Sequence, residues 1–208
     1  MYKRQGMETF VATPELQSDT SIGSDPLPAG QVWAMGPGGL DESLGLYRIE
    51  VSVGPGNGVR LLNRPIPQAF QESLRFAEQN LYARATELVG DRDPRGHEFT
   101  VQVRAMDAAR SGRGLGLPAL LALCSSLLGK SLRGGLVAVG ALNLGGSLEP
   151  VHNPVPIAEH AVEKGASTLL MPVSARKQLF ELSDDMATKL DIQFYSDVRE
   201  ALVKGLVE

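Results

Sequence analysis

The chain has 208 residues, of which 43% are hydrophobic, and it carries a formal net charge of −4 at pH 7. This length suits one sizeable domain with a tail, and the acidic balance does not indicate a nucleic-acid-binding segment. The single cysteine, Cys124, excludes an internal disulfide and a cysteine-based zinc site, and we interpret it as a small buried hydrophobic residue.

No apolar run in the chain approaches the roughly 18 residues that a membrane-spanning helix needs. The first residues carry charge but are not followed by the apolar stretch of a signal peptide. We therefore expect a cytoplasmic location and no contact with a membrane.

Residues 1–29 are rich in Ser, Thr, Asp, Pro and Gly and show no sustained apolar periodicity. This composition is typical of a disordered tail or a linker. We therefore expect one folded domain over residues 30–208. A linker at this end also suggests that the domain is the C-terminal module of a larger protein.

The first part of the domain is predicted to contain several strands. A short strand is expected over 31–35, and alternation of apolar and polar residues indicates half-buried strands over 44–53 and 98–106. The glycine cluster at 54–58 favours a hairpin turn, with 59–62 as the returning strand.

The rest of the domain alternates between helices and strands. Predicted helices cover 67–89, 117–128, 157–164, 174–182 and 197–206, and predicted strands cover 136–142, 147–151, 167–171 and 192–195. Gly90 is expected to end the first helix, and Ser174 and Asp197 are expected to cap later ones. Strands that come first and then alternate with helices favour a single α/β domain with a mixed sheet.

A glycine-rich loop from Ser111 to Gly116 precedes the apolar helix at 117–128. Hydrolase folds often place a nucleophile, or hold an anion, at such a loop. Gly114 at its centre has no side chain and cannot react. Ser111 could act as a displaced nucleophile or cap the turn, and Arg113 could bind a carboxylate or phosphate. The loop lacks the glycine spacing of dinucleotide-binding sites.

The chain has three histidines, His97, His152 and His160. They do not form a metal-binding motif, so we expect neither a metal nor another cofactor in this chain. His152 is an alternative general base for Ser111. Glu159 and His160 are interpreted as a solvated helix face.

Several runs of sequence, in unbroken order, resemble the proteolytic domain of Lon ATP-dependent proteases. These runs are 111–116, 128–133, 139–151, 165–172, and 191–194 with 198–202. The first stands where the family has Asp-Gly-Pro-Ser-Ala-Gly, and the third is similar to the family's Thr-Gly-Glu-Ile-Thr-Leu-Arg-Gly-Gln-Val-Leu-Pro-Ile. The resemblance covers about residues 31–207, and it implies a Lon proteolytic-domain-like, ribosomal-protein-S5-domain-2-like architecture.

Residues 44–51 and 55–58 look most like the Lon-like C-terminal domain of BREX phage-defence AAA+ proteins of the BrxL type. This resemblance implies an upstream AAA+ ATPase, a homo-oligomeric, hexamer-like ring, and action on DNA through the full-length parent. ATP and Mg would belong to that ATPase, because this chain contains no Walker A motif.

The catalytic positions depart from the family pattern. The family's nucleophilic serine falls on Gly114, and its catalytic lysine falls on Val155. Without a hydroxyl and a neutral amine, the covalent Ser/Lys route is closed. We therefore predict a catalytically silent domain that acts as an oligomerisation and assembly module of a BREX-type protein.

Two other functions remain open. One is an ATP-dependent Lon-type serine peptidase domain that uses Ser111 as nucleophile with a base such as His152. The other is an autonomous ligand-binding α/β domain that works as a monomer.

Overall fold

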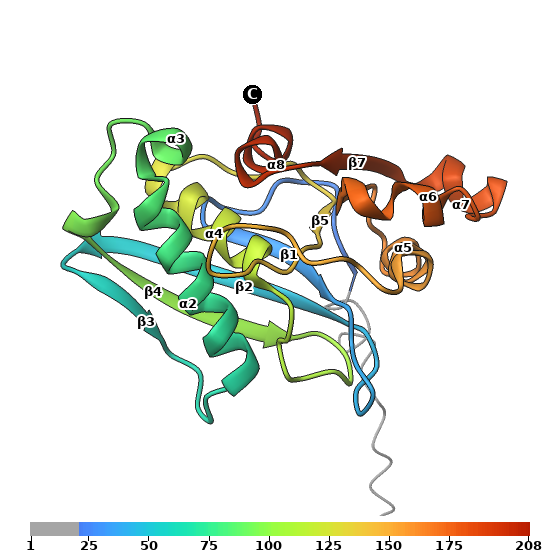
Figure 1. Ribbon diagram of the computed structural model, residues 1–208, viewed down its shortest axis with the longest axis horizontal. Coiled ribbons are helices and arrows are strands. Elements are labelled where there is room, and N and C mark those ends of the chain that lie inside the picture. The colour runs from blue at the N-terminus through green and yellow to red at the C-terminus, as the bar shows by residue number, and fades with distance from the viewer. Residues whose placement is uncertain (1–20) are drawn as a thin grey trace, which may run out of the picture.

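The alternating segments of the chain form one mixed sheet in the computed structural model, which describes residues 21–208 (Figure 1). Within that range the strands are β1 Gln31–Gly36, β2 Gly45–Pro55, β3 Gly58–Leu61, β4 His97–Ala105, β5 Leu136–Ala138, β6 Thr168–Pro172 and β7 Asp191–Tyr195. Their order across the sheet is β3-β4-β2-β1-β5-β6-β7. The expected α/β fold with a mixed sheet is confirmed.

The two halves of the sheet differ in strand direction. β2 pairs in antiparallel fashion with β1 on one side and β4 on the other, so that Ile49 lies opposite both Val32 and Val103. β1, β5, β6 and β7 pair in parallel. Because alternate side chains point to opposite faces, Ile49, Val32 and Val103 contribute to the core beneath α2 and α4.

The predicted hairpin at 54–58 is wrong. β3 does not pair with β2 but joins the outer edge of β4 in parallel, with Gly58 opposite Glu98. β4 pairs with β2 from Tyr47 to Pro55 and so occupies the edge that a hairpin partner would need. The longer alternating strand provides more paired backbone and more buried side chains than the short β3.

The long helix predicted over 67–89 is divided in two. α2 covers Gln68–Ala83 and α3 covers Ala85–Val89, and Arg84 between them has non-helical angles of φ −120° and ψ 24°. Gly90, with a φ of +64°, ends α3 as expected.

α4, Gly116–Leu128, lies between α2 and the sheet (Figure 1) and is buried along almost its whole length. This position requires a helix that is mostly apolar all round, and the hydroxyls of its two buried serines, Ser125 and Ser126, donate hydrogen bonds to backbone carbonyls. Cys124 is buried within it, and burial raises the pKa of its thiol to about 12, so that the thiol is inert in the folded protein.

The second half contains α5 Pro154–Glu163, α6 Arg176–Leu179, α7 Asp184–Lys189 and α8 Val198–Gly205. Asp197 caps α8 by accepting a hydrogen bond of 2.8 Å from the amide of Glu200, as predicted. Ser174 caps no helix, because it lies inside the 3-10 turn Val173–Ala175. The sequence analysis missed α7, which buries no residue and begins at the Ser183 cap.

The strand predicted over 136–142 is shorter, and the one predicted over 147–151 does not form. After β5 the chain turns back on itself, and only the bridge between Leu142 and Leu148 remains of the expected pairing. The turn is closed by the amide of Gly146, which donates to the carbonyl of Asn143 at 3.1 Å. This segment therefore forms a loop beside the start of α4.

Core side chains pack on both faces of the sheet. One cluster lies under α2, α4 and α8, and the other includes Trp33, Leu169 and residues of α5. Most of the predicted tail at 1–29 lies outside the described residues. Within its described part, Ile22 is 5% exposed and belongs to the second cluster. None of the helices in residues 21–208 has the length and apolarity to cross a membrane.

Candidate functional site

The glycine-rich loop after β4 is fixed by contacts with β2 and α2. The amide of Gly112 donates a hydrogen bond of 3.1 Å to the hydroxyl of Tyr47. Gly112 has a φ of +67°, and a Cβ atom on it would lie 2.7 Å from the Cβ atom of Phe70. Glycine is required here because the backbone is left-handed and α2 leaves no room for a side chain.

Gly114 is the residue onto which the sequence analysis places the family's nucleophilic serine. It has a φ of +70°, and a Cβ atom on it would lie 3.0 Å from Cδ of Pro37. Any other residue would be strained by both the backbone and the close proline ring. The local backbone is therefore adapted to a residue without a side chain.

Val155 is the residue onto which the sequence analysis places the family's lysine. It lies in the first turn of α5, where its partly buried side chain packs against the second core cluster. An isopropyl group cannot accept a proton. Among the described residues that line the cavities around Gly114, none is a lysine that could replace it.

Ser111 is bound to a carboxylate. Its hydroxyl donates to Oε2 of Glu42, while its amide and that of Arg110 donate to Oε1 at 2.9 and 2.6 Å. Burial acts to raise the pKa of Glu42, but these hydrogen bonds and the charge of Arg113 outweigh it and lower the pKa overall. Glu42 thus remains ionised and ties the loop at 37–44 to the glycine-rich loop.

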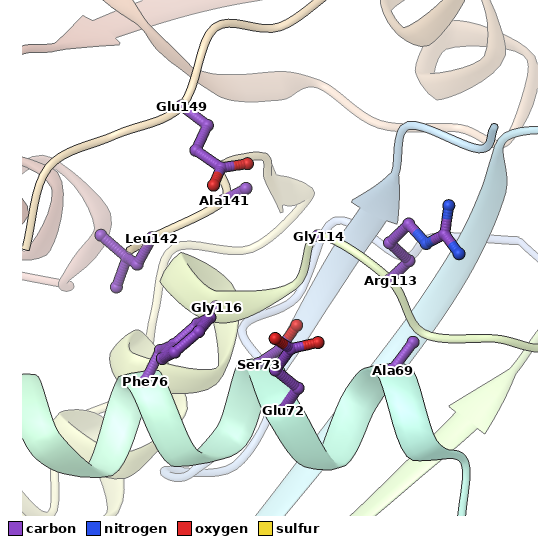
Figure 2. A pocket seen from close by; sticks show the side chains of 10 residues that line it. All are labelled: Ala69, Glu72, Ser73, Phe76, Arg113, Gly114, Gly116, Ala141, Leu142 and Glu149. Carbon is purple, nitrogen blue, oxygen red and sulfur yellow. The ribbon is translucent and has the colours of Figure 1, made fainter. Parts of the chain in front are cut away.

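Two cavities meet at Gly114. The first, of about 220 Å³, lies between α2 and the loop that follows β5, and Figure 2 shows the side chains around it. The second, of about 190 Å³, includes the exposed His152 in its lining. Both are lined by Arg113, Gly114, Ala141 and Glu149.

Ser111 lines neither of these cavities, and no hydrogen bond joins it to His152 within residues 21–208. The structure therefore does not bring the alternative nucleophile and the alternative base together. Their assignment as a catalytic pair stays a prediction.

His160 does not lie on a solvated face, so that part of the interpretation is wrong. Its Nε2 atom lies 2.9 Å from Oδ2 of Asp107, and both side chains are largely buried. The amide of Leu46 donates to the same carboxylate oxygen at 3.0 Å. The pair joins α5 to the end of β4, whereas Glu159 is exposed as expected. In the part of the chain that the structure describes, no group of residues is suited to hold a metal ion.

The sequence analysis missed the acidic residues of the first cavity. Glu72 comes from α2, and Glu149 comes from the loop after β5. Glu149 lies within a run that resembles the Lon family, but that resemblance assigns it no role. Nothing in the sequence around Glu72 indicates that this face of α2 borders the glycine-rich loop.

Comparison with known proteins supports the resemblance. Residues 71–175, about half of the chain, match the family model described as subunit ChlI of Mg-chelatase. Proteins named Lon-like protease BrxL, from Escherichia coli and Bacillus cereus, are 29% and 22% identical over 96% of this chain. A Lon protease of Lawsonia intracellularis is 27% identical over 94% of it. The chain spans 29% of the length of each BrxL relative and 23% of that Lon protease.

The matches include the elements that build the site. The family model covers most of α2, all of β4 and α4, and the glycine-rich loop between them. The Lon-like relatives extend the similarity over nearly the whole described domain. The chain therefore belongs to the family described as subunit ChlI of Mg-chelatase, and it is a Lon-like α/β domain.

Proposed function

We propose that this Lon-like domain is catalytically silent and serves as an oligomerisation and assembly module of a BREX-type AAA+ phage-defence protein. The names of its BrxL relatives support the wider context. The fraction of those proteins that it spans leaves room for the ATPase that the proposal requires. That upstream module would bind ATP and Mg, and the full-length parent would contact DNA.

The observation that carries the proposal is the conformation of Gly114. The position has no hydroxyl, and its left-handed backbone beside Pro37 disfavours one. Val155 provides no amine at the second position. Loss of a catalytic group lowers hydrolase rates by several powers of ten. The strands and helices around Gly114 are nevertheless formed. A retained fold without its reacting groups suits a binding or assembly role in a cytoplasmic ring of hexamer-like size.

Peptidase activity provides the direct test. The purified chain is incubated with fluorescently labelled casein and, separately, with a fluorophosphonate probe, with an active Lon protease as the positive control. We expect neither hydrolysis above the buffer rate nor covalent labelling. Turnover or labelling of a serine would refute the silent assignment.

Assembly is tested by the mass of the particle in solution. Light scattering over a concentration series should show species at multiples of the 22.2 kDa chain. A monomer at all concentrations would instead support an autonomous ligand-binding domain.

One observation favours the peptidase alternative enough to test it. The Ser111 hydroxyl donates to an ionised carboxylate, Glu42, and such a contact can orient a nucleophile. If any preparation hydrolyses casein, Ser111→Ala should abolish the activity. Activity that survives this substitution would exclude Ser111 as the nucleophile.

A further inference from the structure

β7 is the outermost strand at one end of the sheet, and its outer edge borders a cavity of about 310 Å³. The lining comes from β7, from the start of α6 and from α8, which Figure 1 shows on either side of the strand. Ile192 and Phe194 pack against the core cluster on one face of the sheet, and Tyr195 belongs to the cluster on the other. Because both faces contribute to the lining, the cavity lies along the edge itself.

The backbone of β7 presents hydrogen-bonding groups along this edge. The amide of Asp191 donates to the carbonyl of Ser167, so Asp191 is directed toward β6. Successive residues of a strand direct their backbone groups to opposite sides, and Ile192 and Phe194 therefore face away from β6. Nζ of Lys204 donates to the carbonyl of Phe194. Among residues 21–208, this leaves the amide and carbonyl of Ile192 and the amide of Phe194 for another strand.

The side chains at the edge include a cation that the described residues do not neutralise. The guanidinium of Arg176 lies over the ring of Phe194, 5.0 Å from its centroid, and forms no ion pair within residues 21–208. Glu200 also lines the cavity, but hydrogen bonds from Ser196 and Lys204 engage it and lower its pKa to about 2. The edge therefore favours an extended segment that brings its own carboxylate to Arg176.

The sequence contains such a segment before the described residues. Residues 9–13 read Thr-Phe-Val-Ala-Thr, and β-branched and aromatic side chains of this kind are favoured in strands. Gly6 and Pro14 bound the run, as is typical of a short strand. Glu8 precedes it directly and supplies a carboxylate. The segment thus combines the backbone preference and the charge that the edge of β7 favours.

The described chain begins close to this edge. Oγ of Ser21 lies 3.2 Å from the place that a Cβ atom on Gly165 would take. Gly165 comes two residues before Ser167, whose carbonyl accepts from the first amide of β7. The eight residues from 14 to 21 span up to about 26–29 Å when extended. β7 has five residues and is roughly 17 Å long, so the connection is long enough to place residues 8–13 along it.

We infer that residues 8–13 bind the outer edge of β7 in the same chain as an added, antiparallel strand. A segment that runs along β7 toward Ser21 has this direction, and it brings Glu8 to the far end of the strand, where Arg176 lies over Phe194. Chain direction, length and charge thus agree. The inference concerns a different part of the fold from the Gly114 region and does not rest on the proposed function.

A second copy of the chain fits this edge less well. Its own β7 would bring Asp191 as the carboxylate, but Nε2 of Gln193 already donates to that group at 2.8 Å. Residues 8–13 are also tethered to the domain whose edge they would cover, and a short tether provides an effective concentration in the millimolar range. The same segment from a neighbouring copy is distinguished by dilution.

Hydrogen–deuterium exchange of the full chain, read by mass spectrometry, tests the added strand. The reference is a synthetic peptide of residues 6–15 at the same pH. We expect the amides of residues 9–13 to exchange at least about tenfold more slowly in the protein than in the peptide, because the strand pairs them. Equal rates in the protein and the peptide would overturn the inference.

Charge variants place the segment on β7. Glu8→Arg and Arg176→Glu should each speed exchange several-fold in residues 9–13 and at Ile192 and Phe194, and the two substitutions together should restore the slow exchange. Lys177→Glu is the matched control, because Lys177 is exposed on α6 but does not line the cavity. Slow exchange of residues 9–13 that neither charge variant changes would show that the segment binds elsewhere and would overturn the assignment.

Dilution identifies the source of the strand. Exchange rates of residues 9–13 that stay the same over a hundredfold dilution support binding within one chain. Protection that is lost on dilution would show that a second copy supplies the segment, and it would overturn the inference in this form. Light scattering on the same samples keeps the assembly role separate, since an assembled particle whose residues 9–13 exchange freely overturns only the added strand.

Discussion

At the scale of single residues, the backbone at position 114 restricts which residue can stand in the glycine-rich loop. Glycine tolerates a φ of +70°, while an L-residue with a side chain there is strained by ~1–2 kcal/mol. The nearby Pro37 ring restricts the space further. A serine introduced at this position is therefore expected to lower the stability of the fold.

We predict that Gly114→Ser lowers the free energy of unfolding by about 1–3 kcal/mol and does not produce casein hydrolysis. Urea denaturation measures the first effect. Gly129→Ala is the matched control, because Gly129 also has a positive φ but a Cβ atom there would meet nothing within 4 Å. A Gly114→Ser protein that is as stable as the wild type, or that cleaves casein, would contradict this account.

At the scale of elements, local patterns predicted the strands and helices better than their partners. Period-two alternation identified β2 and β4, and the apolar run identified α4. The hairpin prediction was wrong because β2 pairs with β4, which is far from it in the sequence, and local patterns do not show such a partner. The carboxylates of the cavity were missed for the same reason, since Glu72 meets the glycine-rich loop only when α2 packs on α4.

Glu42 joins the 37–44 loop to the glycine-rich loop by accepting hydrogen bonds from two backbone amides. Its lowered pKa means that the folded state favours the ionised carboxylate. The contact therefore contributes stability above the unfolded-state pKa of about 4.3, and this stability is lost as the pH falls through the folded-state pKa.

We predict that Glu42→Gln lowers the melting temperature at neutral pH, and that the difference from the wild type shrinks below about pH 4. Melting curves across this range measure the effect. Glu87→Gln, an exposed carboxylate without such partners, should show no comparable trend. A difference that stays constant or grows on acidification would show that the charge of Glu42 is not responsible.

At the scale of the whole molecule, the two core clusters tie distant segments into one unit. Composition alone placed the start of the domain at residue 30, because polar and turn-forming residues dominate before it. Composition does not show what a single apolar residue contacts. Ile22 lies in the second cluster, and its amide donates a hydrogen bond of 2.9 Å to the carbonyl of Lys164 at the end of α5.

Ile22→Ala tests where the folded unit begins. A large side chain that is only 5% exposed leaves a cavity when truncated, so we expect the free energy of unfolding to fall by about 2–4 kcal/mol. Leu40→Ala is the control, because Leu40 is fully exposed and its loss removes no packing. Chemical denaturation of both variants measures the difference. If Ile22→Ala proved as stable as Leu40→Ala, the segment before residue 30 would behave as the linker that its composition indicates. A loss in the expected range would instead make this segment part of the packing that holds α5, and with it Val155, against the sheet.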